Sequence, residues 1–415
     1  MTAASSAVTE RTGSRSIAFA IVVMLFFAWG FINANNDPLI AALLHAFSLT
    51  YTQSISVQLV SFLAFIVLSM PTAGLLARIG APRTILTGLA AMACGCVIVA
   101  SSNRVPSFAI ILCGLFVLAG GVVALQVAAN PLAATMGPAE RSHFRLTLAQ
   151  SFNALGAVLG VHFGAWTMLG GVRPEALDIA AVSHAFLMIG AALIVLAGLI
   201  LLVRRALVVP PDDTAPPASD GRSAAWRSRW ALAGAGAIAL YVGAEVSIGS
   251  MLVLFLATPE GFGISLAASS GYVANAYWGG ALIGRFFGSW MLRRIAARQL
   301  LPVAAVAAAL LCGLSLVLPG RLGGWCLLGV GLFNSIMFPT IFTLTLERST
   351  ASHASTSGLL CGAIGAGAIL PLFAATLADH IDLRASFGAP LVGYVYVAYF
   401  AIAISRSATA LPAEV

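Results

Sequence analysis

This chain of 415 residues is 60% hydrophobic and only 8% charged. Soluble proteins carry about 25% charged residues, so a water-soluble globular fold is excluded, and the continuous rather than alternating apolar runs exclude a closed β-barrel. The net charge of +7 comes from arginines. They lie in short segments between the apolar runs, so membrane topology explains this charge better than a nucleic-acid partner does.

Apolar runs long enough to cross a bilayer as helices recur along the whole chain. In the first half they cover residues 17–47, 52–77, 84–101, 106–136, 146–171 and 183–203, and in the second half 230–257, 267–292, 299–319, 322–346, 354–379 and 386–405. The segment between the halves is rich in proline and arginine, which is typical of a flexible linker. The sequence therefore predicts an all-α integral membrane protein of twelve transmembrane helices, with an N-terminal six-helix bundle over residues 1–203, a cytoplasmic linker over 204–229 and a C-terminal six-helix bundle over 230–415.

The arginines are distributed unevenly between the two sides of the predicted helices. With the N-terminus in the cytoplasm, sixteen of the 21 arginines face the cytoplasm and four face the opposite side. Positive residues favour the cytoplasmic side, so both termini are predicted to be cytoplasmic. The first apolar run is too long for a signal-peptide core, which predicts an uncleaved first helix and a multi-pass protein of the bacterial inner membrane.

The two halves of the chain are similar to each other at an offset near 210 residues. Gly74–Arg83 follows the second predicted helix and Gly288–Ile295 follows the eighth, while Pro131 lies in the fourth helix and Pro339 in the tenth. Two parallel six-helix repeats, with a binding site at the membrane midplane, describe the architecture of the major facilitators.

Two carboxylates, Asp37 and Glu245, lie inside predicted helices, one in each half. A charged residue at this depth costs about 2.5–3.5 kcal/mol on insertion scales, so such residues usually serve a proton, an ion or a substrate. Asp37 precedes Pro38, which predicts a kink within a long first helix; the alternative is that the helix ends here at the outer surface. We predict that Asp37 carries a transported proton, with Asn33 one turn earlier on the same face.

Several motifs, taken in chain order, resemble the fucose permease family of proton-coupled sugar transporters within the major facilitator superfamily, closest to its glucose/galactose transporter branch. The similarity to the family as a whole lies in Phe27–Ile40, Leu125–Pro131 and Arg145–Asn153, and the similarity to the glucose/galactose branch lies in Tyr241–Ser250, Tyr277–Phe286 and Met337–Phe342. The resemblance implies import of a neutral hexose, deoxyhexose or N-acetylhexosamine with a proton, by alternating access.

The chain departs from the family in the fourth helix, where fucose-transporting members have a glutamate and this sequence has Gln126. A glutamine can bind a sugar hydroxyl, but it cannot exchange a proton. The resemblance therefore implies that proton coupling rests on Asp37, with Glu245 as a second candidate, or is absent. The alternatives are an uncoupled sugar facilitator and an efflux antiporter of the same fold.

Glu245 has two interpretations that the sequence leaves open. It can face the cavity as an acceptor for a sugar hydroxyl, or it can form a structural salt bridge with Arg285, the one arginine inside a predicted helix. An unpaired charge would be costly there, so some partner is expected. We predict that Arg285 holds neighbouring helices together rather than touching the substrate.

Carboxamide side chains occur at helical spacing in two adjacent predicted helices. Gln126 and Asn130 are four residues apart and Gln150 and Asn153 are three apart, so each pair shares one helix face. Such residues can simply pin helices together, but two pairs on neighbouring helices suit a sugar, whose hydroxyls each need a donor and an acceptor. We predict that these four residues bind the substrate, with Asn275, Trp278 and Asn334 as weaker candidates.

The loop after the second helix, Gly74–Arg83, also resembles the cytoplasmic loop motif of the facilitators. This similarity implies gating roles for Arg78, Arg83 and, in the second half, Arg293. We expect no enzyme activity, because the sequence has neither a catalytic constellation nor a large soluble loop. We also expect no cofactor or metal, because none of the six cysteines forms a C-x-x-C pair. The predicted partners are a monosaccharide, a proton and the lipid bilayer, and one chain is expected to work as a monomer.

Overall fold

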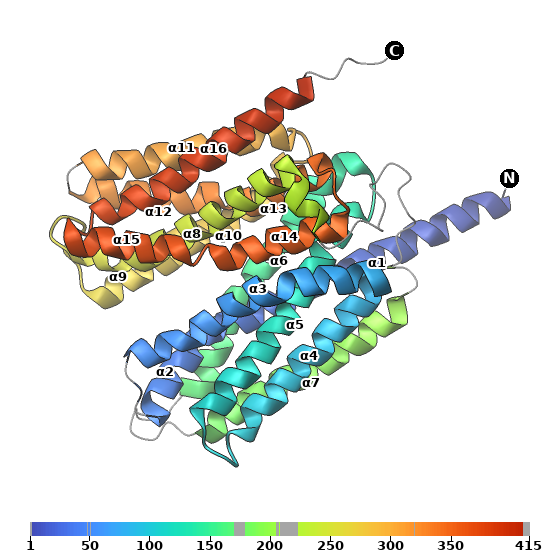
Figure 1. The fold of residues 1–415 in the computed structure, drawn as a ribbon, viewed down its shortest axis with the longest axis horizontal. Coiled ribbons are helices and arrows are strands. Elements are labelled where there is room, and N and C mark those ends of the chain that lie inside the picture. The colour runs from blue at the N-terminus through green and yellow to red at the C-terminus, as the bar shows by residue number, and fades with distance from the viewer. Residues whose placement is uncertain are drawn as a thin grey trace. The chain divides into compact units, whose positions relative to one another are not determined.

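The computed structural model describes residues 2–47, 49, 51–169, 179–204, 207, 223–318 and 320–409. All regular elements in this part of the chain are helical (Figure 1), which confirms the predicted all-α fold. The first half contains α1 (Thr2–Ala34), α2 (Asn36–Ala46), α3 (Tyr51–Ile79), α4 (Ala81–Ser101), α5 (Phe108–Thr135), η1 (Ala139–Arg141), α6 (Ser142–Gly164), η2 (Ala165–Leu169) and α7 (Ile179–Val203). The second half contains η4 (Ala224–Arg227), α8 (Arg229–Ala257), α9 (Leu266–Tyr272), η5 (Val273–Trp278), α10 (Gly279–Met291), α11 (Ala297–Val317), α12 (Arg321–Asn334), α13 (Met337–Arg348), α14 (His353–Ala366), α15 (Ile369–His380), η6 (Ala385–Phe387) and α16 (Gly388–Thr409).

Most of the predicted spans each correspond to a long helical segment of their own. Among the described residues, ten helices are long and apolar enough to cross a membrane, and the bent pair α12 and α13 makes eleven if it is counted as one span. The predicted span 267–292 corresponds to α9, η5 and α10, which follow one another without a gap. Because η5 is a π-helical turn and such turns interrupt the α-helical hydrogen-bond ladder, this span is not one continuous α-helix.

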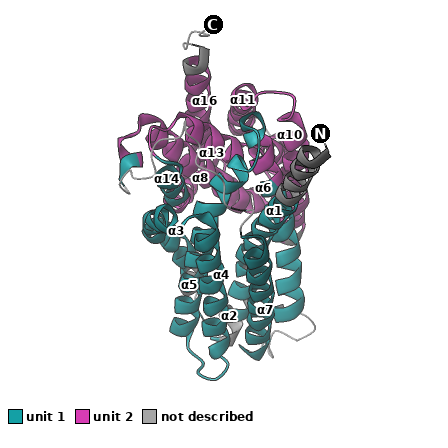
Figure 2. Cartoon of the chain, turned by 90° about the vertical axis from the view of Figure 1, so that its right-hand side faces the viewer, with its two compact units in different colours: residues 1–142, 149–224, 352–362 teal, residues 143–148, 225–351, 363–415 magenta. Residues whose placement is uncertain are grey.

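The chain divides into two compact units (Figure 2). Unit 1 comprises residues 1–142, 149–224 and 352–362, and unit 2 comprises residues 143–148, 225–351 and 363–415. Two short segments therefore belong with the opposite half of the sequence. The first is the start of α6, residues 143–148, and the second is the segment 352–362, most of which lies in α14.

The first predicted helix is broken one turn before its proline. Pro38 has no amide hydrogen, so the carbonyl of Ala34 loses its helical partner. α1 ends at Ala34 and α2 begins at Asn36. The side chain of Asn35 donates from Nδ2 to the carbonyl of Phe31 at 2.6 Å. The helical path is thus interrupted at Asn35 and resumes in α2, which extends beyond Asp37 to Ala46. This agrees with the predicted kink, and the position of Asp37 relative to the membrane surface stays a prediction.

A second proline explains the bend between α12 and α13. The two helices are inclined by 40° at a short break after Asn334. Pro339 has no amide hydrogen to donate to the carbonyl of Ser335, so the series of helical backbone hydrogen bonds is interrupted at this point. Tyr241 of α8 donates its hydroxyl to the carbonyl of Asn334 at 3.1 Å. A neighbouring helix therefore satisfies a backbone acceptor at the break, as a membrane interior requires.

Helices α1 and α6 of unit 1 approach each other closely enough for backbone contact. A Cβ atom added at Gly156 would lie 2.2 Å from the carbonyl oxygen of Phe27, and one added at Gly160 would lie 2.2 Å from that of Phe31. Small residues at a spacing of four permit this close packing between membrane helices. The glycines therefore determine how closely the carboxamide-bearing α6 lies against α1.

We expect Gly160→Ala to destabilise the protein by about 1–3 kcal/mol, because the added methyl group collides with backbone and overpacks the interface. The measurement is the thermal unfolding midpoint of the purified protein in detergent. Gly198→Ala on α7 is the matched control, since a Cβ there meets nothing within 4 Å and alanine favours helix. Equal midpoints for the two variants would contradict the proposed close contact.

Candidate functional site

Three of the predicted carboxamides are buried inside unit 1, and two of them are in contact. Gln126 and Asn130 lie on α5 and Gln150 lies on α6; Asn130 is fully buried and both glutamines are 7% exposed. Nε2 of Gln150 donates to Oδ1 of Asn130 at 3.5 Å. Nδ2 of Asn130 is buried and has no acceptor among the described residues. A buried donor without an acceptor is costly, so this amide group is poised to bind a ligand or a water molecule.

The fourth carboxamide of the first half makes a different contact. Asn153 donates from Nδ2 to the backbone carbonyl of Phe26 at 3.1 Å, and therefore connects α6 to α1. This is the helix-pinning geometry that such residues often adopt. Asn33 lies exposed on α1. The side chain of Asp37 lies outside the described residues, and its role stays a prediction.

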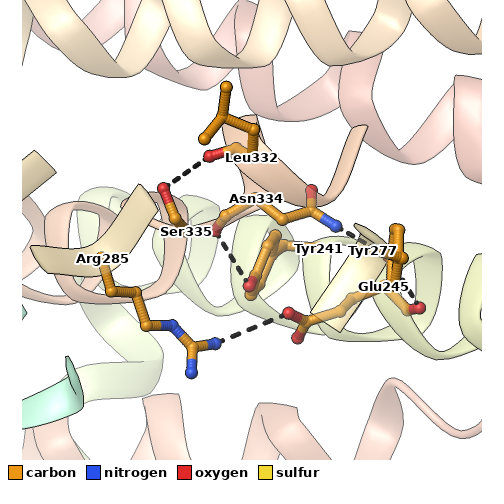
Figure 3. Close-up of polar contacts among 7 residues, drawn as sticks. All are labelled: Tyr241, Glu245, Tyr277, Arg285, Leu332, Asn334 and Ser335. Atoms are coloured by element: carbon orange, nitrogen blue, oxygen red, sulfur yellow. Dashed lines mark hydrogen bonds and ion pairs between the residues drawn. The ribbon is translucent and has the colours of Figure 1, made fainter. Parts of the chain in front are cut away.

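A polar cluster joins three helices and a π-helical turn of unit 2 (Figure 3). Asn334 of α12 donates from Nδ2 to the hydroxyl oxygen of Tyr277 at 2.9 Å, and the hydroxyl of Tyr277 donates to the backbone carbonyl of Glu245 at 3.1 Å. Arg285 of α10 faces the Glu245 carboxylate. Asn334, Tyr277 and Tyr241 are buried, so most of the cluster is shielded from solvent by the surrounding helices.

The carboxylate of Glu245 and the guanidinium of Arg285 form an ion pair. Oε1 and Nη2 are 3.6 Å apart, and the side chains are 13% and 15% exposed. The separation exceeds the roughly 2.7–2.9 Å of a charge-assisted hydrogen bond. Oε1 of Glu245 and Nε of Arg285 have no hydrogen-bond partner among the described residues. The salt bridge that the sequence left open as one interpretation is therefore present, and it leaves hydrogen-bonding capacity unused.

Asn275 and Trp278 are more exposed than the cluster beside them. Asn275 donates from Nδ2 to the carbonyl of Gly271 at 2.9 Å. It lines a pocket of about 400 Å³ with Tyr272 and Trp325. The ring of Trp278 is packed against Gly249 of α8, where a Cβ atom would lie 2.8 Å from Cζ2. Asn275 is thus placed where a ligand could reach it, whereas Trp278 contributes at least in part to packing.

The predicted gating arginines lie at helix ends. Arg78 and Arg83 are exposed at the junction between α3 and α4. Arg293 follows α10, and its guanidinium carbon lies 5.3 Å from the ring centroid of Phe144, which is a cation–π contact. Arg293 therefore contacts the start of α6 within unit 2.

Sequence reasoning did not assign roles to Tyr241 and Tyr277, although both hold the unit 2 cluster together. A signal was available for Tyr241, because it lies four residues before Glu245 and shares its helix face. For Tyr277 no such signal exists, since it reaches Glu245 from another element. Only the packing of η5 against α8 and α12 brings its hydroxyl to this carbonyl.

The chain is similar to known proteins along nearly its whole length. Residues 17–370 match the family model described as Major Facilitator Superfamily. The chain is 40% identical over 406 residues to the glucose/galactose transporter of Brucella abortus, covering 96% of this chain and 97% of that protein. It is 29% identical over 424 residues to the L-fucose-proton symporter of Escherichia coli, covering 95% and 94%. The crystal structure of the transporter FucP in the outward conformation superposes with a TM-score of 0.82 at 26% identity, covering 94% of this chain and 99% of that one.

Proposed function

The chain belongs to the Major Facilitator Superfamily, and we propose that it imports a neutral monosaccharide together with a proton. The similarity to a glucose/galactose transporter and to a fucose-proton symporter extends over nearly the whole length of each protein. It favours glucose, galactose or a related hexose as the substrate. The observation that carries the proposal is the buried carboxamide group of Gln126, Asn130 and Gln150 in unit 1.

The carboxamide group has the chemistry that a sugar requires. Each carboxamide supplies two N–H donors and a carbonyl acceptor, and each sugar hydroxyl donates one hydrogen bond and accepts others. The unused Nδ2 donor of Asn130 would complete its bonding on a sugar oxygen. We propose the same substrate-binding role for Asn33, Asp37, Asn153, Glu245, Asn275, Trp278 and Asn334.

Proton coupling is assigned to carboxylates, because Gln126 cannot titrate. Asp37 is the proposed carrier, since an acidic side chain within an apolar membrane helix is costly unless it has a function. Glu245 is the second candidate, and its Oε1 atom lacks a hydrogen-bond partner among the described residues. Arg285 would hold Glu245 in place, and Arg78, Arg83 and Arg293 would act in gating.

The proposal includes a topology. The excess of arginine on one side favours an inner-membrane protein with both termini in the cytoplasm. In alternating access the moving parts would be residues 1–203 and 230–415, joined by the linker 204–229, and a single chain would suffice in a lipid bilayer.

The proposed function is tested by uptake of a panel of radiolabelled hexoses into proteoliposomes, with and without an imposed inward proton gradient. Accumulation of one sugar only under the gradient would support proton symport. Equal uptake under both conditions would make the protein a facilitator. If no sugar in the panel moves, the sugar assignment is wrong and export of other compounds becomes the leading alternative.

We expect Gln150→Ala to raise the KM for sugar about 2- to 10-fold with little change in the maximal rate, the effect of losing a hydrogen bond to bound substrate. Uptake kinetics in proteoliposomes measure both constants. Gln58→Ala removes an exposed carboxamide on α3 and is the matched control. If Gln150→Ala lowers the unfolding midpoint but leaves KM unchanged, the residue pins helices and does not bind sugar.

A further inference from the structure

Three arginines lie close together in the sequence at the junction between α10 and α11. Arg293 and Arg294 follow the end of α10, and Arg298 is in the first turn of α11; all three side chains are exposed. The first turn of α11 contains no acidic residue. None of the three guanidinium groups forms an ion pair or a hydrogen bond within the described part of the chain. The described residues therefore leave this positive charge without a counter-charge.

Two of these guanidinium groups rest on aromatic rings. The guanidinium carbon of Arg294 lies 5.0 Å from the ring centroid of Trp290, and that of Arg293 lies 5.3 Å from the ring centroid of Phe144. Both distances are typical of cation–π contacts. A guanidinium stacked on a ring keeps its N–H groups at its edge. The rings therefore hold Arg293 and Arg294 in place and leave their hydrogen-bond donors available.

An aromatic surface continues from Arg294 along α10. The ring centroids of Trp290 and Phe287 are 5.5 Å apart, with 30° between the ring planes. Trp290 is 46% exposed and Phe287 is 56% exposed. Aromatic side chains with an exposed face are enriched where a membrane meets water. Trp290 and Phe287 therefore give the arginine junction an apolar surface directly beside its charge.

Both helices at the junction also expose apolar residues at helical spacing. These residues recur every three or four positions, so they lie on one side of each helix: Ile283, Phe287 and Trp290 on α10, and Val303, Val306 and Leu310 on α11. α10 ends the predicted span 267–292, and α11 is long and apolar enough to cross a membrane. In a bilayer, acyl chains can cover these faces, and the arginines follow where the apolar surface of α10 ends.

This combination of groups indicates the chemistry of a ligand. Arginine recognises phosphate, because its guanidinium can donate two parallel hydrogen bonds to phosphate oxygens. A soluble phosphate compound would leave Trp290 and Phe287 uncovered, whereas acyl chains would cover them. The ammonium group of a zwitterionic phospholipid would be repelled by three arginines without a counter-charge. An acidic phospholipid matches both the charge and the apolar surface, as basic clusters at helix ends do in other membrane proteins.

We propose that the three arginines, together with the rings of Trp290 and Phe287, bind an acidic glycerophospholipid such as phosphatidylglycerol. Its phosphate would lie on the arginines and its acyl chains along α10. All five residues belong to unit 2, and the predicted topology places them in the cytoplasmic leaflet. The site includes none of the proposed sugar-binding residues and does not depend on the proposed transport function.

The test measures lipid binding by purified, delipidated protein in detergent, without sugar. A ligand that binds only the folded state raises the thermal unfolding midpoint. Titration with dioleoylphosphatidylglycerol and with dioleoylphosphatidylcholine therefore gives an apparent affinity for each lipid. Glycerophosphoglycerol, the same acidic headgroup without acyl chains, shows whether a soluble phosphate compound is sufficient. We expect the wild type to bind phosphatidylglycerol more tightly than both other compounds.

The double variant Arg294→Gln with Arg298→Gln should weaken binding of phosphatidylglycerol about 25-fold, at about fivefold for each basic residue lost. Its affinity for phosphatidylcholine should change little. The matched control is Arg104→Gln with Arg141→Gln, which removes two exposed arginines from other helix ends and changes the net charge equally. Binding of phosphatidylglycerol by this control should equal that of the wild type.

Several outcomes would overturn the lipid site. Equal affinity of the wild type for the two lipids is one, and undiminished binding by Arg294→Gln with Arg298→Gln is another. An equal loss in the control variant would reduce the effect to net charge. Glycerophosphoglycerol bound as tightly as the lipid would make this a site for soluble phosphate compounds. If the double variant does not fold, Arg298→Gln alone should weaken binding about fivefold, and no change in that variant would refute the proposal. Failure of the wild type to move sugar would overturn the proposed function alone.

Discussion

Asp37→Asn is expected to abolish sugar accumulation while preserving sugar exchange. A proton gradient of one pH unit is worth about 1.4 kcal/mol, so a symporter moving one proton per sugar can concentrate its substrate about tenfold. Asparagine keeps the size and polarity of the side chain but cannot release a proton. The accumulation ratio of the variant should therefore fall to about one under the same gradient, while exchange of labelled for unlabelled sugar continues.

The comparison is made in proteoliposomes with an imposed inward gradient. Asp379→Asn is the matched control, because Asp379 is an exposed carboxylate near the end of α15 and its loss should leave the tenfold ratio intact. Gradient-driven accumulation that survives in Asp37→Asn would remove Asp37 as the carrier and move the role to Glu245. Loss of both accumulation and exchange would instead assign Asp37 to sugar binding.

Arg285→Met is expected to destabilise the protein by about 3–5 kcal/mol, because it leaves the Glu245 carboxylate buried and without its cation. The double variant Glu245→Gln with Arg285→Met should recover most of this loss, since no uncompensated charge remains. The thermal unfolding midpoint in detergent measures both effects. Arg298→Met, which removes an exposed arginine on α11, is the control and should leave the midpoint unchanged.

The same double variant separates the two roles of Glu245 in transport. A stable double variant that still accumulates sugar tenfold would show that Glu245 is structural. A stable double variant that exchanges sugar without accumulating it would place Glu245 in proton coupling. Equal instability in the single and double variants would contradict the ion pair as the source of the effect.

The sequence by itself determined the class of protein and the course of its helices. A membrane interior offers no hydrogen bonds, so each apolar run of sufficient length must satisfy its backbone internally as a helix. Proline positions likewise predict where a helix breaks, because the missing amide hydrogen of proline removes the helical hydrogen bond to the carbonyl one turn earlier. This is why the break before Pro38 followed from local sequence, and why the break before Pro339 has the same explanation.

Contacts between helices were decided by the tertiary structure. Helical spacing places Gln126 with Asn130 on one face of α5. Only the packing of α5 against α6 brings Gln150 to Asn130. Asn153, on the same helix as Gln150, contacts α1 instead. The rotation and depth of each helix depend on side chains throughout the interface. A pattern along one helix therefore does not reveal which neighbour its polar groups meet.

The same reason applies to the unit 2 cluster and to the contact between His143 and Glu347. Sequence indicated that Glu245 needs a partner and offered Arg285, yet the tyrosine hydroxyls and the Asn334 carboxamide come from elements distant in the chain. His143 lies near the start of α6, and no local pattern in the sequence marks a role for it. Its contact with Glu347 exists because the tertiary fold places the start of α6 with unit 2, and that placement is a property of packing rather than of local sequence.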